Sequence, residues 1–209
     1  MGLLKGSVSY TKFFVQGEVP GDFRDRFLEA IRMRAFTPLT PEEEAEERVG
    51  WCPFDSPYAP EEGFEYNGVF YNQYLNLAFR ADRWRFPGPV FRALFDKMAK
   101  VYLEKQGRKR LGKREKEELK VMVGKKLRKQ FSPAVQVVEL SWDLDSGVCR
   151  FAHQSPKVHE HLHELFEKTF GLKLLAGGPF ADALHAGLPE AFLKTIEHLE
   201  PSAFHAVAS

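Results

Sequence analysis

The stretch VQVVELSWDLDSGVCRFA, residues 135 to 152, holds two apolar-rich runs separated by a short turn sequence. Residues 135 to 144 and 148 to 152 favour β-strands because they are rich in β-branched and aromatic side chains. Between them, Asp145, Ser146 and Gly147 suit a tight turn, since Asp and Gly tolerate positive φ angles. The stretch therefore predicts a β-hairpin.

A helix is expected directly after this hairpin. Ser155 suits the N-cap, Pro156 the first helical position and Gly171 the C-terminal end. Apolar side chains then recur at helical spacing and predict one buried face, formed by Val158, Leu162, Leu165 and Thr169, with Phe166 and Phe170 beside them.

The remaining chain predicts further elements of both kinds. Residues 3 to 15 favour a strand, and a helix from Pro20 to about Phe36 places Phe23, Phe27 and Ile31 on one face. Residues 38 to 67 are rich in Pro and Glu and predict a loop with one or two acidic helical turns. Residues 69 to 84 predict a long strand or a hairpin, and residues 188 to 199 a short helix. We expect an α+β fold with an antiparallel or mixed sheet packed by helices.

Composition indicates a folded protein. Of 209 residues, 44% are apolar, which is enough to bury a core as one domain or as two small ones that share a sheet. No run of 18 apolar residues occurs and the first residues lack the features of a secretory signal, so we expect a cytoplasmic protein without a membrane partner. Cys52 and Cys149 are too few for a disulfide framework and are best interpreted as buried apolar residues.

Residues 90 to 131 divide the expected body into two parts, 1 to 89 and 132 to 209. They predict a protruding helical hairpin, because helical patterns lie on both sides of Gly107 and Gly112. In the second helix, Lys113, Lys116 and Lys120 form one stripe, and a second stripe is apolar, formed by Leu119, Met122, Val123 and Leu127.

This hairpin is strongly basic, although the chain as a whole has a formal net charge of only +1. Residues 97 to 129 contain fourteen Lys or Arg and four Glu. Such a patch on an otherwise acidic chain is typical of proteins that bind nucleic acid through its phosphates, without reading the sequence. The candidate DNA-binding residues are Arg108, Lys109, Arg110, Lys113, Arg114, Lys116, Lys120, Lys125, Lys126, Arg128 and Lys129.

Two other interpretations of the basic hairpin stay open. Its cations could be an ordinary solvated helical face, since Lys-rich surfaces are common. Alternatively, the chain is a protein-interaction module in which the acidic segment 42 to 47 and the basic hairpin engage a partner or each other.

The sequence HEHLH, residues 159 to 163, raises the alternative of a zinc-dependent hydrolase. On a helix, His159 and His163 would share a face and could bind Zn²⁺, with Glu160 as general base. A third ligand would have to come from elsewhere, for example His185 or Glu190. The alternative without a metal is a half-exposed helix flank that packs against the β-hairpin.

Two further groups of residues have structural explanations. Asp143 and Asp145 could be metal-binding carboxylates of a nuclease, but the turn accounts for Asp145, and Asp143 is expected to point outward beside Trp142. Trp51, Trp84 and Trp142 are expected in the core or at an interface rather than as platforms for base stacking.

Three stretches in order resemble the bacterial recombination-associated RdgC family. They are GWCP at 50 to 53, RLGKREKEELK at 110 to 120, and SWDLDSGVCRF at 141 to 151 followed by a helix that ends in LFEKTFGLKL. In that family a Gly-Trp-x-Pro element precedes a strand, a Lys-rich helix carries a similar motif, and a strand pair precedes an amphipathic helix.

The resemblance implies a homodimeric ring or clamp that encloses double-stranded DNA and restrains the recombinase RecA, with no catalytic residue, metal or cofactor. It implies that Lys113, Arg114, Lys116 and Lys120 line the DNA channel and that Phe131 lies near a contact between subunit tips. Members of the family are longer, and their additional C-terminal part contributes to the base of the ring. A shorter clamp, an open dimer or a relative that binds something else are therefore alternatives to the closed ring.

Overall fold

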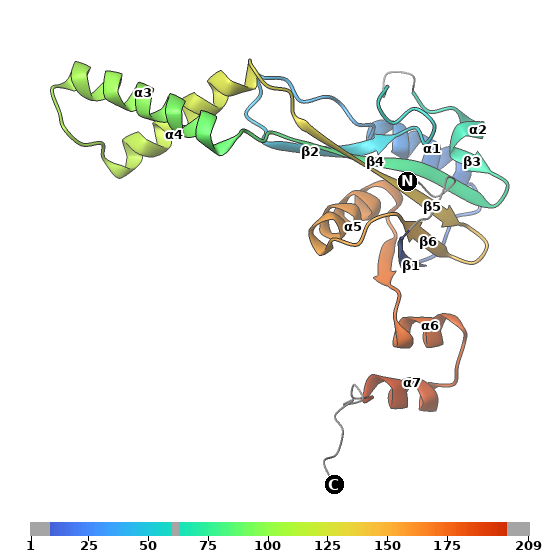
Figure 1. The fold of residues 1–209 in the computed structure, drawn as a ribbon. Helices are drawn as coiled ribbons and strands as arrows, with labels where there is room; N and C mark the ends of the chain where they lie inside the picture. Colours follow the sequence, from blue (N-terminus) through green and yellow to red (C-terminus); the bar gives the residue numbers. More distant parts are fainter. Residues whose placement is uncertain (1–8, 60–62, 200–209) are drawn as a thin grey trace, which may run out of the picture.

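The computed structural model describes residues 9–59 and 63–199 and shows a curled antiparallel sheet with helices packed on it (Figure 1). Seven strands occur in these residues, and six of them follow the order β2-β4-β5-β6-β1-β7, while β3 pairs with β4. The strands are β1 (Thr11–Gln16), β2 (Glu47–Cys52), β3 (Phe70–Tyr71), β4 (Tyr74–Arg83), β5 (Ala134–Asp143), β6 (Val148–Phe151) and β7 (Lys173–Ala176). The expected α+β class with a sheet packed by helices is confirmed.

β4 and β5 are the two longest strands of this sheet, with ten residues each. They pair over their full length, from Tyr74 opposite Asp143 to Arg83 opposite Ala134. β5 then turns into β6 through the predicted hairpin, with Gly147 at a φ of +69° in the turn. The segment 69 to 84 is a hairpin rather than one long strand, because Asn72, at a φ of +52°, reverses the chain between β3 and β4.

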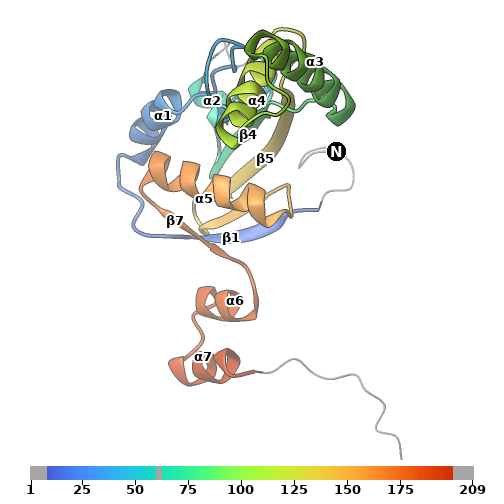
Figure 2. The ribbon, with the colours of Figure 1, turned by 90° about the vertical axis from the view of Figure 1, so that its left-hand side faces the viewer.

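Two helices cover the concave face of the sheet, α1 (Phe23–Met33) and α5 (Pro156–Phe170) (Figure 2). Their apolar faces meet the inward side chains of the strands in one continuous core, which includes Phe27, Ile31, Trp51, Phe79, Trp142, Phe166 and Phe170. Trp51 and Trp142 are fully buried and Trp84 is 9% exposed, so the three tryptophans belong to the interior. Trp51 Nε1 donates a hydrogen bond to Thr169 Oγ1 at 2.8 Å, which ties β2 to α5.

The two cysteines are buried on opposite faces of the sheet. Cys149 belongs to the concave core, whereas Cys52 lies with Phe36 and Ala78 on the other face. Burial raises the pKa of the Cys52 thiol to about 11 and raises the pKa of Cys149 even further. Both thiols are therefore neutral and unreactive at physiological pH.

Several expectations need correction. The segment 38 to 67 contains the edge strand β2, because pairing with β4 overrides the local Pro- and Glu-rich composition, and the short helix α2 (Tyr66–Val69) begins at its end. β1 begins at Thr11, and the earlier part of the strand expected from residue 3 lies largely outside the described residues. After α5 come β7 and α6 (Pro179–His185), which were not expected, and α7 (Glu190–Glu197), which was.

The α5 boundaries agree with the prediction, although the cap does not work as expected. Pro156 is the first helical residue and Gly171 ends the helix in the left-handed region, at a φ of +69°. The Ser155 side chain makes no capping hydrogen bond. Its backbone N–H instead donates to Nδ1 of His153 at 3.0 Å.

None of the helices in residues 9–59 and 63–199 is both long and apolar enough to cross a lipid bilayer.

Candidate nucleic-acid interface

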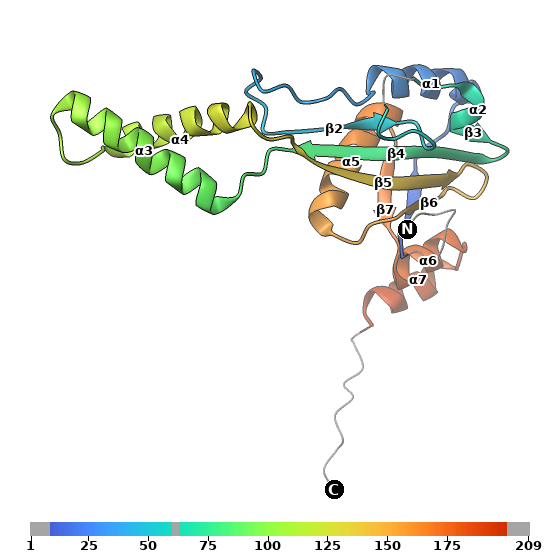
Figure 3. The ribbon, with the colours of Figure 1, turned by 45° about the horizontal axis from the view of Figure 1, so that its top comes forward.

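The helical hairpin projects from one end of the body as an arm made of α3 (Gly88–Gln106) and α4 (Lys113–Arg128) (Figures 1 and 3). It leaves the sheet after β4 and returns into β5, the two longest strands. Gly107, at a φ of +63°, ends α3, and Gly112 is the N-cap of α4. The predicted helices and glycine breaks are thus confirmed.

A narrow apolar seam holds the two helices of the arm together. On α4, Leu119, Val123 and Leu127 are buried, as expected from their spacing. Met122, placed in the same stripe by sequence, is 45% exposed and lies beside the seam. No residue of α3 is buried, so its apolar side chains, among them Phe91 and Phe95, are only partly covered.

Glu115 fastens the tip of the arm. Its carboxylate accepts hydrogen bonds from the backbone N–H of Gly112 at 2.7 Å and from the hydroxyl of Tyr102 at 3.0 Å, and it pairs with Arg108. The Gly112 N–H, followed by Arg108 and Tyr102, lowers the pKa of this carboxyl below its usual range. One acidic side chain thereby joins α3, the turn and the start of α4.

The eleven candidate cations divide into three groups. Four form ion pairs: Arg108 with Glu115, Arg114 with Glu118 at 2.9 Å, Lys120 with Glu117 at 2.8 Å and Lys125 with Glu44 at 3.2 Å. A fifth, Arg128, is buried. The other six are exposed and have no carboxylate partner within the described ranges: Lys109, Arg110, Lys113, Lys116, Lys126 and Lys129.

Arg128 does not belong to the open surface of the arm. It is 8% exposed, and its guanidinium lies 5.7 Å from the centre of the Trp84 ring. It donates hydrogen bonds to the backbone carbonyls of Glu43 and, at 3.4 Å, Glu44. The expectation that Arg128 contacts DNA is therefore wrong, because burial at the base of the arm makes it a structural contact.

These contacts show that the acidic segment and the basic hairpin do engage each other. Glu44 pairs with Lys125 through its side chain and with Arg128 through its carbonyl. The contact is confined to the base of the arm, since these two cations lie in the last turn of α4. The unpaired cations nearer the tip, Lys109, Arg110, Lys113 and Lys116, are not neutralised by it.

Phe131 also lies at the base. It is partly buried, and its ring centre is 6.1 Å from that of Phe86 in an edge-to-face contact. Phe86 in turn stacks with Trp84. This aromatic group packs the arm onto the body, so Phe131 lies at the base of the arm, and the contact between subunit tips that the resemblance implies stays a prediction.

The HEHLH segment of α5 packs against β1, the strand that pairs with β6 of the β-hairpin. His159 and His163 both lie edge-on to Phe13, with ring centres 5.2 Å and 5.3 Å away. Nε2 of His159 is 2.8 Å from the carbonyl oxygen of His153. His185, one suggested third ligand, stacks on Phe14, whose side chain lies on the opposite face of β1. Within residues 9–59 and 63–199, no three His, Cys, Asp or Glu side chains gather as a metal site.

Asp143 and Asp145 have a local structural role. Asp143 Oδ1 accepts hydrogen bonds from the backbone N–H groups of Asp145 at 3.1 Å and Ser146 at 3.3 Å. Asp143 follows the buried Trp142 in the alternation of β5, so it points outward as expected, and its side chain closes the β5–β6 turn. Its carboxylate is engaged with the backbone, which accounts for its position without a metal.

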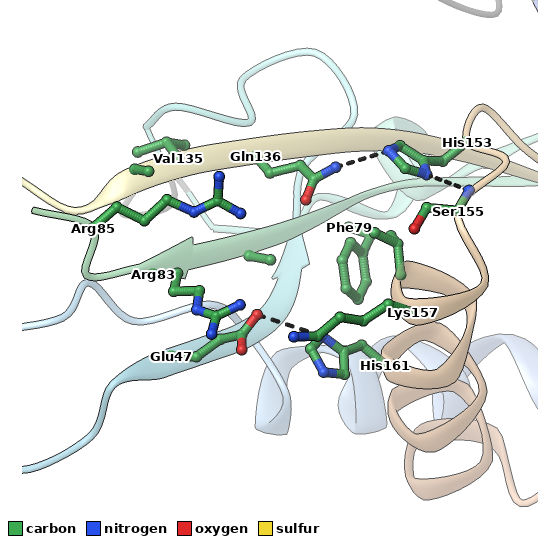
Figure 4. A pocket seen from close by; sticks show the side chains of 13 residues that line it. Glu47, Phe79, Arg83, Arg85, Val135, Gln136, His153, Ser155, Lys157 and His161 are labelled. Atoms are coloured by element: carbon green, nitrogen blue, oxygen red, sulfur yellow. Dashed lines mark hydrogen bonds and ion pairs between the residues drawn. The ribbon is translucent and has the colours of Figure 1, made fainter. Parts of the chain in front are cut away.

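Sequence reasoning missed a second group of cations on the body, close to the arm. A cleft of about 380 Å³ opens between the ends of β2, β4 and β5 and the first turns of α5 (Figure 4). Arg83, Arg85 and Lys157 line it, together with His153 and His161. The signal that could have revealed it is RADRWRF at 80 to 86, with three arginines just before the basic run at 97 to 129.

No known protein-family model matches this chain, and a search of curated proteins finds no significant match.

Proposed function

We propose that the protein binds double-stranded DNA through the basic arm, without sequence preference. The observation that carries the proposal is the set of six exposed arm cations that lack carboxylate partners in the described part of the chain. Four of them, Lys109, Arg110, Lys113 and Lys116, lie at the tip and in the first turn of α4. Cations that are not already paired can neutralise phosphates and release counterions, which favours binding to any duplex.

The shape of the arm supports the same conclusion. A projecting hairpin can lie along a duplex, whereas cations scattered over a convex body could reach few phosphates at once. The arm is also fixed to the body by Arg128 and by the aromatic group around Phe86, which limits the freedom that would be lost on binding.

Charge reversal tests this proposal. The variant Lys109→Glu, Lys113→Glu, Lys116→Glu should bind a fluorescent duplex of mixed sequence at least about tenfold more weakly than wild type, with a flatter dependence on salt. The matched control is Arg26→Glu, Lys173→Glu, Lys194→Glu, which changes net charge equally at exposed positions of α1, β7 and α7. Equal losses in both variants, or no loss in the arm variant, would contradict the proposal.

The resemblance to RdgC proteins suggests a dimeric clamp, and α3 offers a surface for contact with a second copy. Its apolar side chains are only partly covered, and a shallow hollow lies between Phe86, Phe91 and Phe95. Light scattering with size-exclusion chromatography should show a dimer that Phe95→Ser weakens. Met33→Ser, at an apolar position of α1 that is 74% exposed, is the control. If wild type is monomeric at all concentrations, with and without linear duplex, the proposal of a dimeric clamp is wrong.

A role in recombination extends the proposal one step further. A protein that covers duplex DNA without sequence preference would hinder a recombinase such as RecA on the same DNA. Strand exchange by RecA should slow when wild-type protein is added to the duplex and should recover with the arm variant. Equal inhibition by both proteins would show that any effect on RecA does not depend on the cations of the arm.

A further inference from the structure

The cleft at the base of the arm lies where the concave face of the sheet changes from apolar to charged. Along β4, alternate residues Phe79, Ala81 and Arg83 point to this face. The first two belong to the core, whereas Arg83 extends beyond the part that α5 covers. Arg85 follows after the strand ends, and Lys157 approaches from the first turn of α5 (Figure 4).

The walls of this cleft carry an excess of positive charge. The side chains of Arg83, Arg85 and Lys157 form no ion pair or hydrogen bond with any described residue. Among the described residues, Glu47 is the one carboxylate in the lining, and its Oε1 lies 3.6 Å from Nδ1 of His161. Three cations thus face one carboxylate, which leaves the lining with an excess of positive charge.

The neutral groups of the lining are held in place. Nδ1 of His153 accepts a hydrogen bond from the Ser155 N–H, and the Gln136 side-chain amide lies 2.9 Å from its Nε2. Burial, and then the neighbouring His159, lower the pKa of His153, which keeps this ring uncharged at neutral pH. The floor is formed by apolar side chains, including Phe79, Ala81 and Val158. The cleft is therefore a preformed concave site with a few polar groups, as small-ligand sites usually are.

We propose that this cleft binds a phosphate ester. Two arginines and a lysine that converge on a volume of about 380 Å³ match the charge and size of a phosphate with an attached sugar, and arginine is suited to phosphate recognition by its fork of donors. The ligand could be a backbone phosphate of bound DNA or a free nucleotide. The cleft is separate from the tip of the arm, so phosphate binding there is a property additional to the proposed function.

Adenosine monophosphate is the probe for this site. Its dissociation constant is obtained from the rise in unfolding temperature with ligand concentration, at constant ionic strength, for the full-length wild-type chain. The double variant Arg85→Gln, Lys157→Gln should bind at least tenfold more weakly. Both side chains are exposed and unpaired among the described residues, so the variant should fold, which circular dichroism verifies. The matched control, Lys97→Gln, Lys100→Gln on α3, should bind like wild type.

Binding of a fluorescent duplex then distinguishes the two sources of phosphate. If the cleft receives a backbone phosphate, the cleft variant loses affinity for both duplex and nucleotide. If it receives a free nucleotide, duplex binding is unchanged while nucleotide binding is lost. The inference is overturned if the cleft variant binds both the nucleotide and the duplex with the affinity of wild type. It is also overturned if wild type does not bind the nucleotide and the cleft variant binds the duplex as tightly as wild type does. The arm variant described above should leave nucleotide binding unchanged, so failure of either proposal is recognised separately.

Discussion

Arg128 lies over the ring of Trp84, with 5.7 Å between its guanidinium carbon and the ring centre, at the junction of arm and body. Trp84 directly follows β4, and Arg128 is the last residue of α4, so the contact joins both ends of the arm. The same guanidinium donates to carbonyls of the acidic segment. One cation of a basic helix thus fixes the arm, while its neighbours stay open to solvent.

Replacement of Arg128 should therefore lower stability. Arg128→Met keeps much of the apolar stem but removes the donors to the Glu43 and Glu44 carbonyls, and we expect a loss of about 1–3 kcal/mol in the free energy of unfolding. Urea denaturation measures it. The neighbouring Lys129→Met is the control and should change stability by less than about 0.5 kcal/mol, because Lys129 is exposed. Similar values for both variants would mean that Arg128 does not anchor the arm.

Gly50 should not tolerate a side chain. A Cβ at this position would lie 2.6 Å from Cα and 2.8 Å from N of Phe36, whose N–H donates to the Trp51 carbonyl at 2.8 Å. Gly50→Ala must displace this backbone, and we expect a loss of about 1–3 kcal/mol by thermal or urea unfolding. Gly124→Ala on α4 has open space around it and should stabilise the protein by up to about 1 kcal/mol. A neutral Gly50→Ala would contradict the close packing of this segment.

Glu115 should control order at the tip of the arm. Glu115→Gln weakens the hydrogen bonds from Gly112 and Tyr102 and removes the ion pair with Arg108, so amide hydrogen exchange in residues 107 to 116 should become faster. Glu117→Gln, which loses only the exposed pair with Lys120, should leave these rates unchanged. Because the pKa of Glu115 is lowered in the fold, its contribution is present above the ordinary glutamate pKa of 4.5 and disappears as pH falls through the lowered value.

Stability should decrease as pH falls below about 6.5, the ordinary pKa of histidine. Burial lowers the pKa of His153 and His163, so the unfolded chain binds protons at a higher pH than the folded one. The histidine contribution is complete above 6.5 and is lost as pH falls towards the lowered values. Unfolding by urea at pH 7.5 and 5.5 measures this difference. His163→Gln should reduce this difference in the free energy of unfolding, whereas His198→Gln, at an exposed position, should not. An equal pH dependence in both variants would contradict the role given to His163.

Unpaired arm cations should matter more for DNA than paired ones. Lys113→Gln, Lys116→Gln should reduce the slope of log affinity against log salt by about 0.9 for each phosphate that the arm no longer neutralises. Arg114→Gln, Lys120→Gln removes the same charge from the same helix, but these side chains already pair with Glu118 and Glu117. We expect a smaller change in slope for this second double variant. A change of equal size would show that only the total charge of the arm counts.

The local patterns of the sequence predicted the elements that depend on neighbouring residues. The β5–β6 hairpin needed Gly147 in its turn, α5 needed Pro156 and Gly171 at its ends, and the arm needed its two glycine breaks, all of which the structure confirms. β2 could not be predicted in this way, because its first three residues are only partly buried and its stability comes from pairing with β4, about thirty residues later.

The sequence by itself thus determined the α+β class, the position of the arm and the concentration of positive charge on it. Only the tertiary structure decided which cations are available. Arg128 is buried under contacts from residues far away in the chain, and Arg83, Arg85 and Lys157 converge on one cleft from β4, the segment after it and α5. The physical reason is that helical and turn preferences act over a few residues, whereas burial and charge pairing depend on which distant segments the sheet brings together.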